Sequence, residues 1–199
     1  MGVLQDWQVT YDDLDEVVTD NPSLRGMLFG YVAEVKCRKI WFARPEFTDV
    51  VKYVDHDRQE KADIGLTYRN ERFRIEVKSL QTNTVQLNGN KLTAKFQCDA
   101  SDRRTVTLAG GQTVQTTCLL VGQFDILAVN LFAFEKKWRF AFARNNKLPL
   151  SQFRGYTEDV RKQLLATLMP VTWPLELPYV EEPFSLFDEI VQERASQKR

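Results

Sequence analysis

Asp63, Glu76 and Lys78 are the residues of this chain whose types and spacing best fit a chemical role. Glu76 and Lys78 are two residues apart, so a strand would place both side chains on the same face of a sheet. Two carboxylates that converge on one point are typical ligands of a hard cation such as Mg²⁺. An adjacent lysine can orient or deprotonate water, or neutralise negative charge on a phosphate.

The segments that carry these side chains have strand patterns. Residues 72–78 alternate charged and apolar side chains, which is the period-2 pattern of a strand. Residues 62–67 form a second predicted strand, and the polar residues 68–71 between the two favour a turn. A hairpin of these strands would bring Asp63 next to the other two candidate residues.

This arrangement resembles the active site of the PD-(D/E)xK nuclease superfamily, which has the restriction-endonuclease-like fold. Asp63, Glu76 and Lys78 match the motif, and Ala62 stands where the motif has its proline. The resemblance implies a metal-dependent endonuclease similar to type II restriction enzymes, which hydrolyses phosphodiester bonds of DNA with Mg²⁺, or alternatively Mn²⁺. It implies that Asp63, Glu76 and the backbone carbonyl of Val77 hold the metal. Lys78 would position the attacking water or help to deprotonate it.

A helix predicted over residues 24–41, with Ser23 as its N-cap, precedes these strands. Its Glu34 lies beside the apolar face of the helix. In the superfamily the first core helix often supplies an acidic residue, so the resemblance makes Glu34 a further catalytic candidate that assists a second metal ion. The alternative is a solvated carboxylate that pairs with Arg38 at i+4.

Four basic residues are predicted to contact DNA. Arg103 and Arg104 are adjacent, and arginine forks bind phosphates or guanine edges. Lys91 and Lys95 lie on the same face of one predicted strand and could follow a phosphate backbone. Net charge is zero over the whole chain but +7 over residues 30–147, so the basic part contains the candidate site. The alternative is that these charges form an ordinary solvated surface.

The predicted elements form a mixed α/β or α+β architecture around one sheet. The resemblance implies a restriction-endonuclease-like core, with a central mixed β-sheet flanked by helices. Turn signals at 88–90 and 109–112 predict extra β-hairpins where the superfamily core has a helix. Alternatively, residues 99–104 begin a short helix. A nearly continuous apolar strand is predicted at 125–134 and a helix at 157–169.

The sequence divides into three predicted parts. Residues 1–20 form an acidic N-terminal arm with a charge of −6, and residues 21–169 form the nuclease domain. Residues 170–199 form a Pro-rich C-terminal extension that runs extended and carries a short helix at 185–195.

The composition is that of an ordinary soluble globular protein, with 43% hydrophobic and 27% charged residues. No apolar run approaches the roughly 18 residues that span a bilayer. Three scattered cysteines without metal-ligand spacing suit a reducing cytoplasm. A single histidine leaves little material for a Ser-His-Asp triad or a histidine-based metal site.

Partners follow from the resemblance. Enzymes of this class that cut both strands symmetrically are usually twofold dimers, so DNA and a second copy of the chain are the expected partners, with no membrane. Two other functions fit the same residues. One is a DNA repair or junction nuclease of the same superfamily, which differs in whether its DNA is duplex, branched or single-stranded. The other is a non-catalytic DNA-binding or interaction module with this fold.

Overall fold

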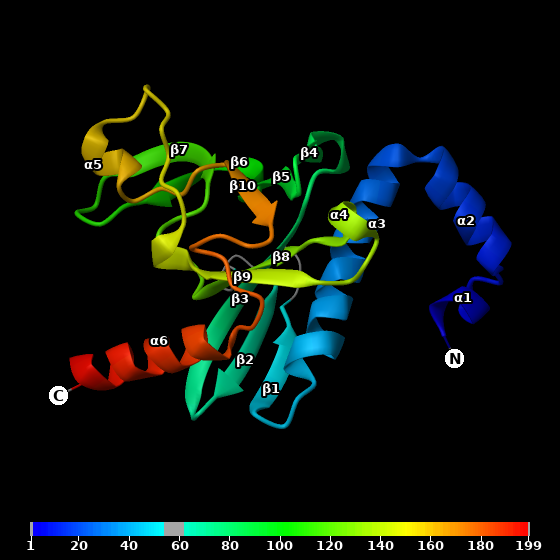
Figure 1. The fold of residues 1–199 in the computed structure, drawn as a ribbon, viewed down its shortest axis with the longest axis horizontal. Coiled ribbons are helices and arrows are strands. Elements are labelled where there is room, and N and C mark those ends of the chain that lie inside the picture. The colour runs from blue at the N-terminus through cyan, green and yellow to red at the C-terminus, as the bar shows by residue number, and fades with distance from the viewer. Residues whose placement is uncertain (1, 54–61, 199) are drawn as a thin grey trace.

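Five strands form the central sheet of the computed structural model, which describes residues 2–53 and 62–198 (Figure 1). In spatial order they are β1 (Phe47–Lys52), β2 (Ile64–Tyr68), β3 (Glu71–Ser79), β8 (Ile126–Asn130) and β9 (Phe140–Arg144). The pair β3–β8 is parallel and the other pairs are antiparallel. The sheet is therefore mixed, as the sequence predicts.

Two hairpins connect β3 to β8, so both predicted turns are confirmed. Residues 99–104 are part of a strand and do not begin a helix. The first hairpin is extended to a three-stranded sheet by a strand from much later in the chain, and the second forms a two-stranded sheet. The strands involved are β4 (Gln86–Asn88), β5 (Lys91–Gln97) and β10 (Leu168–Trp173) in the first, and β6 (Asp99–Thr107) and β7 (Thr113–Cys118) in the second.

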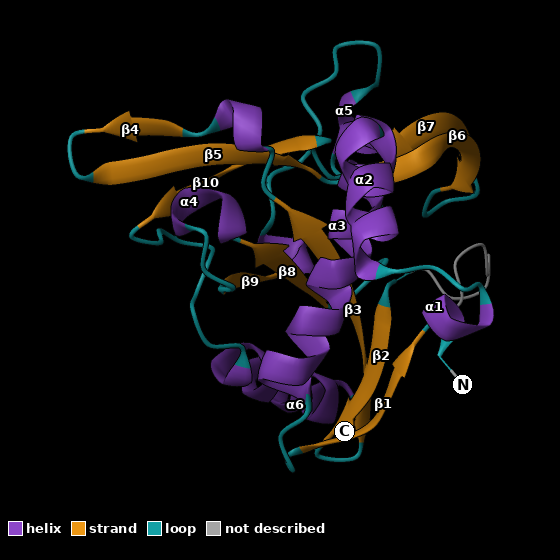
Figure 2. Ribbon diagram, turned by 90° about the vertical axis from the view of Figure 1, so that its right-hand side faces the viewer, coloured by secondary structure: helices purple, strands orange, loops and turns teal. Residues whose placement is uncertain are grey.

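Each face of the central sheet is covered by its own apolar core. On one face, side chains such as Phe73 and Ile75 pack beneath two helices, α3 (Pro22–Cys37) and α6 (Phe184–Gln197). On the other face, Leu127 and its neighbours pack against the sheet of β4, β5 and β10. Figure 2 shows that sheet and α6 on opposite sides of the central strands. Because both its faces are covered, β8 is buried over its whole length.

The helix predicted over 24–41 is confirmed as α3, which continues into a π-helical segment, Arg38–Phe42. It begins earlier than predicted, at Pro22, because proline fits the first helical turn, where its missing N–H is not needed. Ala33 and Cys37 are buried on its inner side, and α3 packs directly on β3 and β8.

Two short helices, α1 (Val3–Asp6) and α2 (Tyr11–Asp20), precede α3 and make up the acidic arm. Thr10 caps α2, since its hydroxyl accepts a hydrogen bond from the Asp13 N–H at 3.1 Å and Asp13 bonds back to the Thr10 N–H at 2.8 Å. Neither helix has a buried residue.

Two predicted elements are wrong in part. The helix predicted over 157–169 shortens to α5 (Glu158–Arg161), because Leu164 and Leu165 pair as bridges with Leu120 and Leu150 instead. Tertiary pairing overrides the helical pattern there. The strand predicted over 125–134 ends at Asn130, whose side-chain oxygen accepts a hydrogen bond from the Phe132 N–H at 3.0 Å. A short helix, α4 (Phe132–Glu135), follows.

The C-terminal segment packs closely on the rest of the chain. β10 pairs with β5 along its whole length. Leu186, Phe187 and Ile190 of α6 are buried against the central sheet. No helix in the described ranges has the length and apolar character needed to cross a membrane.

Candidate active site

Three hydrogen bonds fix Asp63 immediately before β2. Its N–H donates to the Ile75 carbonyl at 3.1 Å, and its carbonyl accepts from the Tyr53 N–H at 3.0 Å. Its carboxylate oxygen Oδ2 accepts from the backbone N–H of Val77 at 2.6 Å. The β2–β3 ladder begins with Ile64 opposite Ile75, so Asp63 reaches past the end of the ladder to Val77.

Glu76 and Lys78 lie on either side of Val77 on β3. Val77 points into the core beneath α3 and α6, so both neighbours point to the opposite face of the sheet. Lys78 Nζ donates to Glu76 Oε1 at 2.5 Å. The structure therefore brings Asp63, Glu76 and Lys78 together at one corner of the central sheet.

The backbone carbonyl of Val77 is directed toward the same corner. Ile75 turns its carbonyl toward β2, where it accepts the Asp63 N–H. Alternate residues of a strand direct their backbone groups to the same edge, so Val77 also faces the Asp63 side, as its N–H bond to Asp63 shows. In the described residues no β2 residue is paired with Val77, so its carbonyl is not used by that ladder.

Burial shapes the charge state of this corner. Glu76 is only 6% exposed. The pKa of Glu76 rises to about 7, chiefly through burial and with smaller contributions from the charges of Asp63 and Glu34, while the attraction of Lys78 opposes the rise. Burial lowers the pKa of Lys78, but the carboxylates of Glu76 and Asp63 outweigh this effect and raise it above the ordinary lysine value. Lys78 is therefore charged at neutral pH. Its positive charge does not fully offset the burial of a negative charge on Glu76.

Glu34 approaches the same corner from α3. It is buried, and Lys52 Nζ at the end of β1 lies 3.5 Å from its Oε2. Its charge raises the pKa of Glu76 and, after burial and Asp63, that of the Cys37 thiol. The solvated carboxylate considered from sequence is therefore wrong, since Glu34 is a buried acid next to the site.

The donor atoms at this corner fit a hard cation. Oδ1 of Asp63 and Oε2 of Glu76 accept no hydrogen bond from residues 2–53 or 62–198, so each carboxylate keeps one oxygen available. Together with the Val77 carbonyl, these are oxygen ligands of the kind Mg²⁺ prefers. In the same two ranges no three His, Cys, Asp or Glu side chains form a metal-binding group. This is compatible with Mg²⁺, which keeps several waters and needs only one or two carboxylates.

The two arginines predicted to contact DNA differ in availability. Arg103 is exposed on β6. Arg104 is half-buried, and its guanidinium donates to the Cys118 carbonyl at 3.4 Å and to Gln123 Oε1 at 3.2 Å. Arg104 therefore already has a role in holding β6 to the end of β7 and to the chain that follows it. A contact of either arginine with DNA stays a prediction.

The two predicted lysines lie on β5. Lys91 pairs with Glu176 at 2.5 Å, near the hairpin turn. Lys95 is exposed, and its carbonyl accepts the Gln81 N–H at 2.8 Å just beyond the end of β3. β5 therefore runs from the hairpin tip to the end of the strand that carries Glu76 and Lys78, and the lysines stay predicted DNA contacts.

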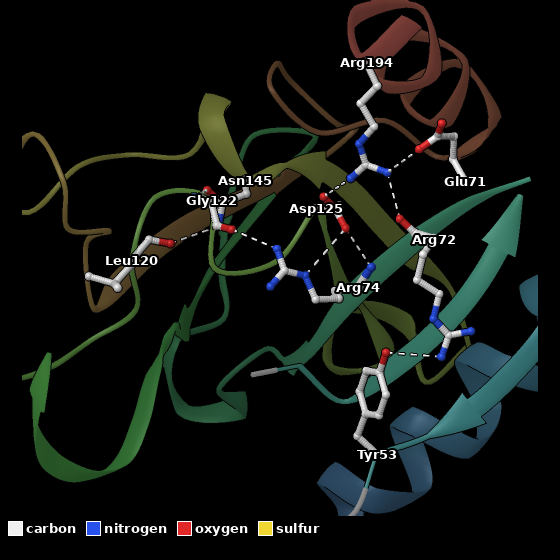
Figure 3. A network of polar contacts seen from close by, with 9 residues as sticks. All are labelled: Tyr53, Glu71, Arg72, Arg74, Leu120, Gly122, Asp125, Asn145 and Arg194. Carbon is white, nitrogen blue, oxygen red and sulfur yellow. Dashed lines mark hydrogen bonds and ion pairs between the residues drawn. The ribbon is translucent and has the colours of Figure 1, made fainter. Parts of the chain in front are cut away.

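Sequence reasoning did not select Arg72 and Arg74, which share the face of Glu76 on β3. The Arg72 guanidinium donates to the Asp49 carbonyl at 3.1 Å and to the Tyr53 hydroxyl at 3.3 Å. The Arg74 guanidinium donates to the Gly122 carbonyl at 3.1 Å (Figure 3). The signal was present in the sequence, because the same alternation that pairs Glu76 with Lys78 places both arginines on their face.

Gly65 of β2 allows this face to be closely covered. A Cβ there would lie 2.2 Å from the Tyr53 hydroxyl oxygen and 2.7 Å from Arg72 Nη2. The glycine two residues after Asp63 therefore leaves room for a tyrosine and an arginine over the strand.

Lys52 and Asp99 are two further charged residues at the site without a sequence signal. Lys52 pairs with Glu34, as described above. Asp99 begins β6, where burial raises the pKa of its carboxyl and the nearby charge of Lys78 lowers it. Both reach the site only through strand packing.

The fold and the site together define an α+β protein with two carboxylates and a lysine at one corner of a mixed sheet. No family model and no curated protein matches the chain. Among solved structures, the structure of this chain is similar to that of a bacterial homing endonuclease, I-Ssp6803I. The TM-score is 0.43 at 16% identity, and the alignment covers 87% of this chain and 97% of that one. The likeness is distant.

Proposed function

We propose that this protein is a Mg²⁺-dependent endonuclease that hydrolyses phosphodiester bonds of DNA. The observation that carries the proposal is the hydrogen bond from the Val77 N–H to Asp63 Oδ2. It fixes a second carboxylate next to Glu76 and Lys78, with the Val77 carbonyl on the same side. A surface hairpin with no chemical role has no reason to bury Glu76 at the cost of raising its pKa.

Asp63, Glu76 and the Val77 carbonyl are the groups that would hold the metal. Bound there, Mg²⁺ lowers the pKa of water and offsets the negative charge that develops on a phosphodiester. A divalent cation also compensates the buried anionic form of Glu76. Mn²⁺, which accepts the same oxygen ligands, is expected to substitute.

The side chains around the metal ligands have separate roles in this proposal. Lys78 is charged and orients the attacking water or stabilises charge at the phosphate. Glu34, held by Lys52, is a further acidic group that can assist a second ion. Arg72 and Arg74 extend the same face of β3 with positive charge, where a phosphate backbone can lie.

Two finer features of the proposal concern the mode of cutting. We place the protein among enzymes that resemble type II restriction endonucleases, with duplex DNA as substrate. Symmetric cutting of both strands requires two active sites, so the active form is a homodimer.

Nicking of supercoiled plasmid tests the proposal. The wild-type protein should cut with Mg²⁺ or Mn²⁺ and stop when EDTA is added. Asp63→Asn, Glu76→Gln and Lys78→Met should each lower the rate by at least about 100-fold. A matched control is the double variant Glu158→Gln/Lys162→Met, which removes an exposed Glu–Lys pair on α5, at 2.7 Å, and should cut normally. Undiminished Mg²⁺-dependent cutting by Asp63→Asn and Lys78→Met would rule the assignment out.

A panel of substrates tests the finer proposal. Plasmid, branched and single-stranded DNA of the same sequence are compared at equal enzyme concentration. Preference for duplex plasmid is expected. Faster cutting of the branched substrate would instead indicate a junction or repair nuclease with the same site.

A further inference from the structure

The acidic arm has large apolar side chains that its own chain leaves uncovered. Trp7 is 69% exposed, Tyr11 83% and Val3 61%. Helices as short as α1 and α2 are marginal in water without packing against another surface. In Figure 1 the arm turns at the start of α3 and lies outside the two cores of the body. The arm therefore has the form of a segment that is completed by a partner.

The charge of the arm restricts what that partner can be. Residues 1–20 carry six acidic and no basic side chains. Such a segment is repelled by DNA phosphates and by anionic membrane surfaces. Its complement is a protein surface that combines exposed apolar side chains with positive charge.

The outer side of α3 has both properties. Leu24, Met27, Tyr31 and Val35 follow one another at spacings of three and four residues, so they form one stripe, and Met27 is 62% exposed. Lys39 continues this stripe one turn beyond Val35. The stretch 22–42 has four basic residues and one acidic residue, the buried Glu34. Arg25 and Lys39 are exposed, and Lys36 is half-buried with its Nζ 5.6 Å from the centre of the Trp138 ring.

We propose that the arm of one copy lies on the outer stripe of α3 of a second copy. The exchange is reciprocal, because each copy offers one arm and one α3 surface. A twofold axis then relates two identical contacts, each of which pairs an acidic apolar arm with a basic apolar helix face. This self-association surface does not depend on the proposed nuclease activity.

Apolar substitutions test the contact. The molar mass of the full chain is measured by analytical ultracentrifugation over a concentration series. The wild type should be a dimer, and Trp7→Asp and Met27→Asp should each weaken association by at least about 30-fold. Leu177→Asp and Leu87→Asp are the matched controls, since these leucines are 88% and 68% exposed on other parts of the surface and should not change the mass. Circular dichroism shows whether each variant is folded.

Charge reversal tests the reciprocal geometry. Lys36→Glu/Lys39→Glu makes the α3 surface acidic, and Asp12→Lys/Glu16→Lys makes the arm basic, so each double variant alone should be monomeric. An equimolar mixture should form dimers, because each arm then meets a surface of opposite charge. A monomeric wild type, or a dimer that both Trp7→Asp and Met27→Asp leave intact, would overturn the proposal. A mixture that stays monomeric while the wild type dimerises would also overturn it.

Discussion

The carboxylate of Asp63 accepts a hydrogen bond from the backbone N–H of Val77 at 2.6 Å, across the open end of the β2–β3 ladder. This bond connects a residue before one strand to the middle of the next. It places the Asp63 carboxylate close to Glu76 and Lys78, which flank Val77, so the candidate site depends on strand register as well as on residue type.

Mg²⁺ should stabilise the folded protein in the absence of DNA. A ligand that binds only the native state adds roughly 1.4 kcal/mol at a tenfold excess over its Kd. The melting temperature of the wild type should therefore rise with Mg²⁺, and that of Asp63→Asn should not. Asparagine keeps an oxygen that can accept the Val77 N–H, so this variant should be folded. An equal rise in both proteins would show that the ion binds elsewhere.

The pH dependence of stability should report the buried carboxyl of Glu76. Its pKa rises from an ordinary value of 4.5 to about 7 on folding. Below about pH 4.5 both states hold the proton, and above it the unfolded state ionises first. The free energy of unfolding therefore falls as pH rises from 4.5 to 7, by on the order of 1–3 kcal/mol. Lys78 stays charged over this range and adds no slope.

Glu76→Gln isolates this effect, because glutamine does not titrate. Denaturant unfolding at a series of pH values should show the wild type losing stability relative to the variant as pH rises from 5 to 8. The sign of this trend is the test, since the loss of the Lys78 contact adds a constant offset. A difference that is independent of pH would contradict the raised pKa.

Gly65→Ala should disturb Tyr53 and Arg72, whose side chains lie over Gly65. The added Cβ would meet the Tyr53 hydroxyl at 2.2 Å, so Tyr53 and Arg72 must move. Both contacts are with side-chain ends, and a cost of about 1 kcal/mol in unfolding free energy is expected. In a Tyr53→Ala background the same substitution should cost clearly less. Additive costs would show that the close approach does not limit this position.

Arg194 should hold α6 to the edge of β3. It donates to Asp125 Oδ1 at 2.6 Å and to the Arg72 carbonyl at 2.7 Å, and Asp125 Oδ2 accepts the Arg74 N–H at 2.7 Å (Figure 3). Arg194→Ala should lower the free energy of unfolding by roughly 2–3 kcal/mol, because it leaves the mostly buried Asp125 carboxylate with only the more distant guanidinium of Arg74, whose Nε lies 3.9 Å away. Lys162→Ala, in an exposed pair, should leave the melting temperature unchanged.

The sequence by itself determined the local parts of this protein. The alternation over residues 72–78 placed Glu76 and Lys78 on one face, since side chains in a strand alternate whatever the strand packs against. The turn residues at 88–90 and 109–112 fixed two hairpins, and the apolar spacing fixed α3. These features depend on backbone geometry within a few residues, so periodicity and turn chemistry reveal them.

Only the tertiary structure decided which distant residues meet. Lys52 pairs with Glu34, Arg194 with Asp125, and Leu164 leaves a helical pattern to pair with Leu120. These partners come from different strands and helices, and their meeting depends on how two cores pack on the sheet. Periodicity assigns a side chain to a face but does not select the element that covers that face. The candidate residues could therefore be selected from the sequence, whereas their burial and their partners required the fold.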